Sequence, residues 1–81
     1  MIQKDIDNRF NSIIKGLIKV QDENSLPYQT FQDLNINSIA FVQLVVMCEQ
    51  EFDIVFENDM LLMEKYPTME VFINYIKAKS S

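Results

Sequence analysis

The strongest constraint on the fold is a helical repeat of apolar residues near the start of the chain. Between residues 2 and 19, apolar side chains recur every three or four positions, which is the spacing of one face of an amphipathic α-helix. This face comprises Ile6, Phe10, Ile13, Ile14, Leu17 and Ile18. The repeat predicts a helix over residues 2–19 that buries this face in a core.

A long loop and three further helices are predicted for the rest of the chain. Residues 20–37 lack the repeat and carry Asp, Asn, Ser and Pro, which favour loops, and a loop this long in a small domain tends to be functional. Pro67 and Thr68 mark the beginning of the last helix, because Thr is a favoured N-cap residue. The predicted helices cover residues 2–19, 38–52, 58–63 and 68–78. The expected fold class is therefore all-α, a small four-helix bundle in which residues 1–81 form a single domain.

The composition excludes several classes of function. With 81 residues, the chain is too small to enclose a deep substrate cavity beside its core. It has no His, one Cys (Cys48) and one Gly (Gly16), so it lacks a His-dependent nucleophile pair, a multi-Cys zinc site and a Gly-rich phosphate loop. We therefore expect no enzymatic activity, no catalytic residues and no metal site.

Charge and hydropathy limit the partners and the compartment. The net charge of −5 argues against nucleic acid, and no apolar run reaches the about 18 residues of a membrane helix. The N-terminus does not look like a signal peptide, because no apolar stretch follows a basic start, and a single Cys fits a reducing compartment. We expect a cytoplasmic monomer that binds neither nucleic acid nor membrane.

Half of the acidic residues fall in one stretch that contains no basic residue. Six of the 12 acids lie between residues 49 and 64, namely Glu49, Glu51, Asp53, Glu57, Asp59 and Glu64. The stretch is either a solvated face or a docking surface for basic partners, which would speed association and weaken with salt.

The helix predicted over residues 38–52 has two apolar stripes instead of one. The first stripe contains Phe41, Leu44, Val45, Cys48 and Phe52, and the second contains Ile39, Val42 and Val46 together with the acid Glu49. A helix that is apolar nearly all round is usually buried. Alternatively, the second stripe lies on the surface, where an apolar strip flanked by acids marks a partner site.

Ser38 stands at the beginning of this helix, either as its N-cap or as its first residue. As an N-cap, its hydroxyl would bond a backbone N–H. Asn37 can serve as the cap instead, which would leave the Ser38 hydroxyl free. The positive end of the helix dipole would then favour a phosphate attached to Ser38.

Residues 33–39, with the sequence Asp-Leu-Asn-Ile-Asn-Ser-Ile, resemble the modification motif of acyl and peptidyl carrier proteins, which is usually Asp-Leu-Gly-x-Asp-Ser-Leu. The similarity covers residues 31–76 and includes the Glu-Gln-Glu-Phe of residues 49–52 and the Tyr-Pro-Thr of residues 66–68. The helix over residues 2–19 agrees with the helix order of this family.

The resemblance implies a carrier of 4′-phosphopantetheine that catalyses nothing itself. A phosphopantetheinyl transferase, using coenzyme A and magnesium, would join the group to Ser38, and the terminal thiol of this arm would hold an acyl or aminoacyl group as a thioester. The motif around the site would consist of Asp33, Leu34, Asn37 and Ile39. Enzymes that load and process the cargo would approach with basic docking patches and bind the face formed by Ile39, Val42, Gln43, Val46 and Glu49.

Four positions depart from the family pattern. Asn35 replaces the usual Gly, and Asn tolerates a positive φ better than most residues. Asn37 replaces an Asp that helps to contact the transferase, so modification is expected to be slower or to need a dedicated transferase. Gln43 stands where many carriers have an acid, and Cys48 stands at a core position, where we interpret it as a small buried hydrophobe.

Two functions remain open at this point. The first is a discrete acyl or peptidyl carrier, and the missing Asp and the moderate acidity favour a specialised polyketide, peptide or modified fatty-acid pathway. The alternative is an unmodified helical adaptor with a carrier fold, which binds a partner through the helix over residues 38–52.

Overall fold

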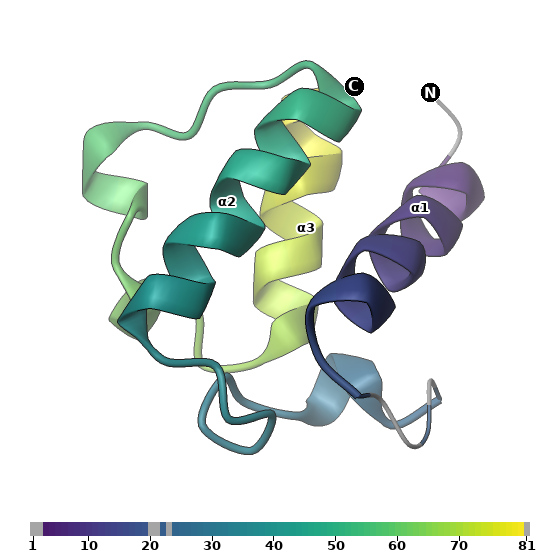
Figure 1. The fold of residues 1–81 in the computed structure, drawn as a ribbon. Coiled ribbons are helices and arrows are strands. Elements are labelled where there is room, and N and C mark those ends of the chain that lie inside the picture. Colours follow the sequence, from purple (N-terminus) through teal and green to yellow (C-terminus); the bar gives the residue numbers. More distant parts are fainter. Residues whose placement is uncertain (1–2, 20–21, 23, 81) are drawn as a thin grey trace.

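Three α-helices form the body of the molecule in the computed structural model, which describes residues 3–19, 22 and 24–80. The helices are α1 (Gln3–Leu17), α2 (Ser38–Phe52) and α3 (Met69–Ser80). Figure 1 shows that α1 runs antiparallel to α2 and α3. None of the described residues forms a strand, which confirms the all-α class. No helix among them is long and apolar enough to cross a membrane.

The helix predicted over residues 58–63 is not confirmed as one continuous helix. Two 3₁₀ turns stand in its place, η2 (Asn58–Met60) and η3 (Met63–Lys65). Between them Leu62 is extended, with φ −116° and ψ 128°, which interrupts any helix. The carbonyl of Met60, which an α-helix would bond to a backbone N–H, accepts a hydrogen bond from the Tyr66 hydroxyl at 2.6 Å. Local backbone bonds close both turns, as from the N–H of Met60 to the carbonyl of Glu57 at 2.9 Å, and the Tyr66 hydroxyl adds a contact from beyond the predicted helix.

The three α-helices keep close to the bounds expected from the sequence. The helix α2 covers residues 38–52 as expected, and α3 begins one residue later and ends two residues later than predicted. The helix α1 ends at Leu17, although the N–H of Ile18 still donates to the carbonyl of Ile14 at 2.9 Å. Its expected start at Ile2 lies outside the described residues. Differences of this size are ordinary at frayed helix ends.

Phe72 on α3 is fully buried at the centre of a cluster of aromatic rings. Its ring centroid lies between 4.9 and 6.1 Å from those of five others, namely Phe10, Phe31, Phe41, Phe56 and Tyr66. These rings come from α1, α2 and both segments that flank α2. The cluster therefore connects α1, α2, α3 and the segments that flank α2 in one core. Each aromatic pair contributes about 0.5–1.5 kcal/mol beyond burial alone.

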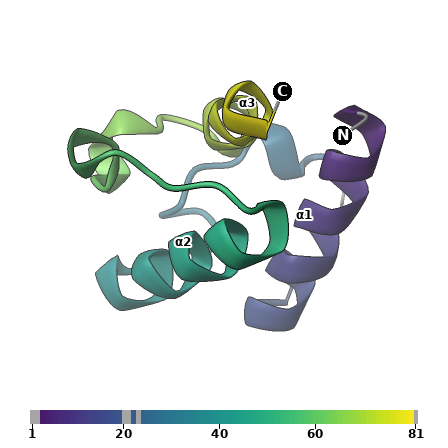
Figure 2. The same ribbon diagram turned by 90° about the horizontal axis from the view of Figure 1, so that it is seen from above.

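Both connections that flank α2 are fastened to the bundle. The loop after α1 contains a 3₁₀ turn, η1 (Leu26–Tyr28), whose Leu26 is buried, and the carbonyl of Gln29 accepts a hydrogen bond from the N–H of Met69 at 2.8 Å. The segment after α2 passes along the side of the bundle away from α1 before it returns to α3 (Figure 2). The loop that leads to the N-terminus of α2 is therefore attached to the core and to α3.

Candidate functional site

Ser38 is the first residue of α2 and is exposed. The N-cap is Asn37, whose side-chain Oδ1 accepts a hydrogen bond from the N–H of Ala40 at 2.9 Å. No hydrogen bond engages the Ser38 hydroxyl within the described part of the chain. The alternative left open by the sequence is therefore decided in favour of Asn37 as the cap, with a free hydroxyl next to it.

Short-range hydrogen bonds hold the turn that leads into this helix. The carboxylate of Asp33 accepts a hydrogen bond from the N–H of Thr30 at 3.1 Å, and the N–H of Asp33 donates to the Thr30 hydroxyl at 2.9 Å. One turn later, the N–H of Ile36 donates to the carbonyl of Phe31 at 2.8 Å, and both of these side chains are buried. Leu34 is half-buried against the core. Asp33 and Leu34 thus shape the approach to Ser38 without touching its hydroxyl.

Asn35 occupies the left-handed region of backbone conformation, with φ 58°. This is the position at which the sequence has Asn in place of the usual Gly. Asn reaches this region at a lower cost than other residues that carry a Cβ, because its short polar side chain bonds locally. The substitution is therefore compatible with the turn.

The two stripes of α2 lie in different environments. The stripe that contains Phe41 and Cys48 is buried, with every member at most 5 % exposed. On the second stripe, Ile39, Val42 and Val46 are 72 %, 58 % and 43 % exposed. This second stripe, with the exposed Gln43, forms a surface strip that extends from Ser38 along the helix.

Glu49 differs from the exposed acid that the sequence suggested. It is half-buried, and its Oε2 accepts a hydrogen bond from the N–H of Phe56 at 2.9 Å. Two other acids of the same stretch are also engaged: Glu51 pairs with Arg9 at 2.7 Å, and Glu57 pairs with Lys79 at 3.0 Å. Half of the acidic stretch therefore makes internal contacts instead of forming one uniform docking surface.

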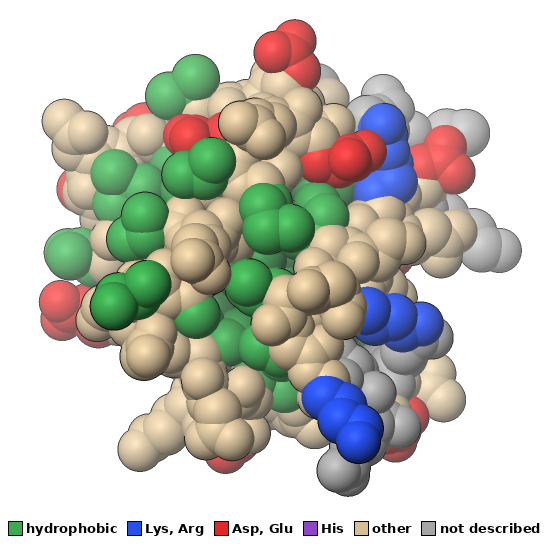
Figure 3. Space-filling model, in the orientation of Figure 1, with side chains coloured by type: hydrophobic (Ala, Val, Ile, Leu, Met, Phe, Trp, Pro, Cys, Tyr) green, Lys and Arg blue, Asp and Glu red, His purple; other side chains and the backbone are tan. Residues whose placement is uncertain are grey.

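Sequence reasoning missed Leu61 and Leu62 as surface residues. They are 41 % and 46 % exposed, and Leu61 lines a groove of about 190 Å³ together with Val42 and Val46. Figure 3 shows the hydrophobic side chains gathered over α2 and over the segment beside it. Two adjacent Leu residues within an acidic stretch could have indicated surface exposure, but the helix predicted over residues 58–63 gave no reason to expect both on the surface.

Cys48 is fully buried, and burial raises the pKa of its thiol from 9.0 to about 12, with smaller contributions from Glu49 and Glu51. A neutral thiol in this environment packs like a small hydrophobe and is a poor nucleophile. The interpretation of Cys48 as a core residue is therefore confirmed. Among the described residues, no group of three side chains is arranged to hold a metal ion.

The features above define a small helical domain, in which an exposed serine stands at a helix N-terminus beside an apolar strip. The family model described as "Phosphopantetheine attachment site" matches residues 8–76, and the chain belongs to this family. Members of this family carry 4′-phosphopantetheine covalently on a serine and hold substrates instead of transforming them. The family match confirms the resemblance to acyl and peptidyl carrier proteins. No solved structure matches the chain.

Proposed function

We propose that Ser38 carries the 4′-phosphopantetheine and that the chain serves as a discrete acyl or peptidyl carrier protein. The observation that supports this assignment is the exposed, unbonded hydroxyl of Ser38 at the first position of α2. Because Asn37 caps the helix, esterification of Ser38 removes no hydrogen bond from the fold.

The surroundings of Ser38 suit a phosphodiester. A phosphate on its Oγ lies next to the N-terminus of a 15-residue helix, where the dipole and the free N–H groups favour negative charge. The nearest acid of the motif, Asp33, already bonds the N–H of Thr30. The residues present therefore fit the prosthetic group.

Attachment requires a phosphopantetheinyl transferase, coenzyme A and magnesium. The Ser38 oxygen forms a bond to the phosphorus nearest the pantetheine, the pyrophosphate bond of coenzyme A breaks, and the nucleotide bisphosphate leaves while the transferase removes the hydroxyl proton. The bound group supplies a terminal thiol that holds acyl or aminoacyl cargo as a thioester. The tether raises the effective concentration of the cargo at each partner enzyme.

The exposed strip of α2 is the proposed contact surface for these enzymes. Ile39, Val42 and Val46 supply apolar contacts next to Ser38, and Gln43 adds a neutral polar group. Glu49, although bonded to Phe56, adds negative charge at the far end of the strip, so we propose that partners bring basic docking patches. We further propose a cytoplasmic monomer in a specialised polyketide, peptide or modified fatty-acid pathway.

The direct test is the intact mass of the protein after incubation with coenzyme A and a broad-specificity transferase. We expect a gain of one phosphopantetheine, no gain in Ser38→Ala, and an unchanged gain in Ser12→Ala, which removes an exposed hydroxyl on α1. Circular dichroism should show both variants folded, because Asn37 still caps α2 in Ser38→Ala. A gain that persists in Ser38→Ala would disprove the assignment.

Asn37 offers a second test of the same proposal. An Asp at this position keeps the capping oxygen and adds a charge that the transferase can contact. We expect Asn37→Asp to be modified faster than the unaltered chain by a broad-specificity transferase. Equal rates would show that the charge at this position has no part in recognition.

The alternative function is an unmodified adaptor that binds a partner through α2. It is favoured by the exposed apolar strip and by Asn37 in place of the usual Asp. In that case partner binding would be unaffected by Ser38→Ala, and the protein isolated from its own cells would lack the arm.

A further inference from the structure

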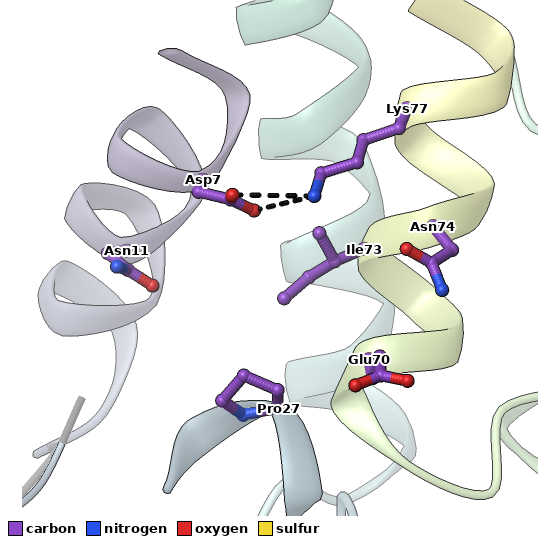
Figure 4. A pocket seen from close by; sticks show the side chains of 7 residues that line it. All are labelled: Asp7, Asn11, Pro27, Glu70, Ile73, Asn74 and Lys77. Atoms are coloured by element: carbon purple, nitrogen blue, oxygen red, sulfur yellow. Dashed lines mark hydrogen bonds and ion pairs between the residues drawn. The ribbon is translucent and has the colours of Figure 1, made fainter. Parts of the chain in front are cut away.

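A polar cleft lies between α1 and α3, as Figure 4 shows. It has a volume of about 350 Å³. None of its lining residues belongs to α2 or to the turn that precedes Ser38. The cleft is therefore separate from the proposed attachment site.

An ion pair closes one end of this cleft. The Lys77 ammonium lies 3.0 Å from Oδ1 and 3.3 Å from Oδ2 of Asp7, and this contact joins α3 to α1. The positive charge of Lys77 is thus compensated within the protein. A ligand that enters the cleft does not meet an unpaired cation.

Three polar side chains along the cleft remain available to a ligand. Glu70 and Asn74 on α3 and Asn11 on α1 have no hydrogen bond or ion pair with any residue that the structure describes. Glu70 is exposed in the first turn of α3, and no cation among the described residues pairs with its negative charge. The cleft therefore offers a carboxylate and two carboxamide oxygens, all of which accept hydrogen bonds.

The floor of the cleft is apolar. Ile73 is only 6 % exposed and points into the cleft, and Pro27 of the turn η1 closes the end opposite the ion pair (Figure 4). An arginine side chain matches this combination of surfaces. Its guanidinium is a permanently charged plane with five N–H donors, and its three-carbon stem packs on apolar surface. Phosphate and carboxylate ligands would instead be repelled by Glu70.

We propose that the cleft between α1 and α3 binds an arginine side chain of a partner protein. The guanidinium pairs with Glu70 and donates to Asn11 and Asn74, while the stem lies over Ile73. Figure 4 shows α2 behind the cleft, and no residue of α2 lines it, so a partner can hold the carrier here while Ser38 remains accessible. A second contact of this kind raises the effective concentration of the carrier at that partner.

The test is a heteronuclear NMR titration of the full chain at low salt with N-acetyl-L-arginine N-methylamide. We expect saturable shifts at the amides of Glu70, Ile73 and Asn74, with a dissociation constant on the order of 1–10 mM. The citrulline analogue, which has nearly the same shape but no charge, should bind at least tenfold more weakly. Equal binding of the two probes would overturn the proposal.

Two variants locate the interaction. Glu70→Gln should weaken the arginine probe at least fivefold, whereas Glu64→Gln, which removes an exposed acid outside the cleft, should leave it unchanged. Equal weakening in both variants would reduce the effect to the overall negative charge and would overturn the proposal. Free L-arginine that binds tenfold more tightly than the blocked residue would overturn it too, because it would indicate a small-molecule ligand.

This proposal stands apart from the assignment of Ser38. The titration is repeated on Ser38→Ala, which should give the same shifts and the same affinity. Loss of binding in Ser38→Ala would overturn the claim that the two sites are separate. Failure of the mass test would not alter the titration, and failure of the titration would not alter the mass gain.

Discussion

The two segments that flank α2 are ordered by different kinds of contact. In residues 30–37, before the helix, the side-chain hydrogen bonds join neighbours in sequence, as between Thr30 and Asp33, while Phe31 and Ile36 anchor the segment in the core. The segment after the helix, residues 53–66, depends on distant residues: Phe56 bonds Glu49, and the N–H of Glu57 donates to the Tyr75 hydroxyl at 3.3 Å. The first segment leads directly into Ser38, the first residue of α2, and the second presents the exposed Leu61 and Leu62.

This difference explains how each segment responds to substitution. A substitution that removes one local bond from the first segment lowers the stability only slightly, because Phe31 and Ile36 still anchor this segment in the core. A segment held by distant residues depends on the whole bundle, so a change at one of its anchors lowers the stability of the entire fold. The following predictions test this contrast.

The largest effect is expected from Tyr66→Ala in the second segment. It removes a buried ring in contact with Phe72 and the hydroxyl that bonds the carbonyl of Met60. We expect a loss of about 3–5 kcal/mol in the free energy of unfolding, measured by urea denaturation. Tyr28→Ala is the control, because this side chain is 74 % exposed and its loss should cost less than about 0.5 kcal/mol. Similar losses in the two variants would contradict the role of Tyr66 as an anchor.

A smaller effect is expected from Asn35→Ala in the first segment. Ala at φ 58° pays the steric cost of the left-handed conformation, which Asn tolerates better, so we expect a loss of about 1–2 kcal/mol by urea denaturation. Asn35→Gly should be nearly neutral, because Gly adopts this conformation freely. If Asn35→Ala were as stable as Asn35→Gly, the turn would not depend on the conformation of this residue.

The smallest expected effect is a pH dependence of the stability that Cys48 contributes, and this residue lies on α2 between the two segments. Because burial raises the pKa of its thiol from 9.0 to about 12, the folded state keeps a proton that the unfolded state releases. The resulting contribution to stability is complete below pH 9 and is lost as the pH rises from about 9 to about 12. The difference in unfolding free energy between the unaltered chain and Cys48→Ala should therefore be constant from pH 7 to 8.5 and decrease above pH 9. A constant difference up to pH 11 would show that the thiol is not buried as described.

The same contrast separates the features that the sequence predicts from those that it does not. The position of Ser38 at the beginning of α2 and the two faces of this helix could be predicted, because a short motif and a helical repeat are local properties of the chain. The identity of the cap could not, because Asn37 and Ser38 are both good N-cap residues and only the geometry separates them. The turns at 58–65 could not be predicted either, because the Tyr66 hydroxyl that takes the Met60 carbonyl has no signature in the segment itself.

The engagement of Glu49 shows a related limit. The helical repeat places Glu49 on the second stripe of α2. Its hydrogen bond from the N–H of Phe56 depends on the path of the segment after α2, which the repeat does not predict. The exposure of Leu61 and its place beside Val42 and Val46 were missed for the same reason. Because the path of residues 53–66 cannot be predicted from the sequence, the groove that Leu61 forms with Val42 and Val46 cannot be predicted either.

Asn37 caps α2 and leaves the hydroxyl of Ser38 free, which has a consequence for the life cycle of the protein. Since the helix is capped without the serine, unmodified and modified chains should share one fold and nearly one stability. If Ser38 carries the prosthetic group as proposed, newly made protein would fold before the group is attached, and release of the group would leave the fold unchanged. Supply of coenzyme A, and not refolding, would set how quickly the pool of carrier becomes competent.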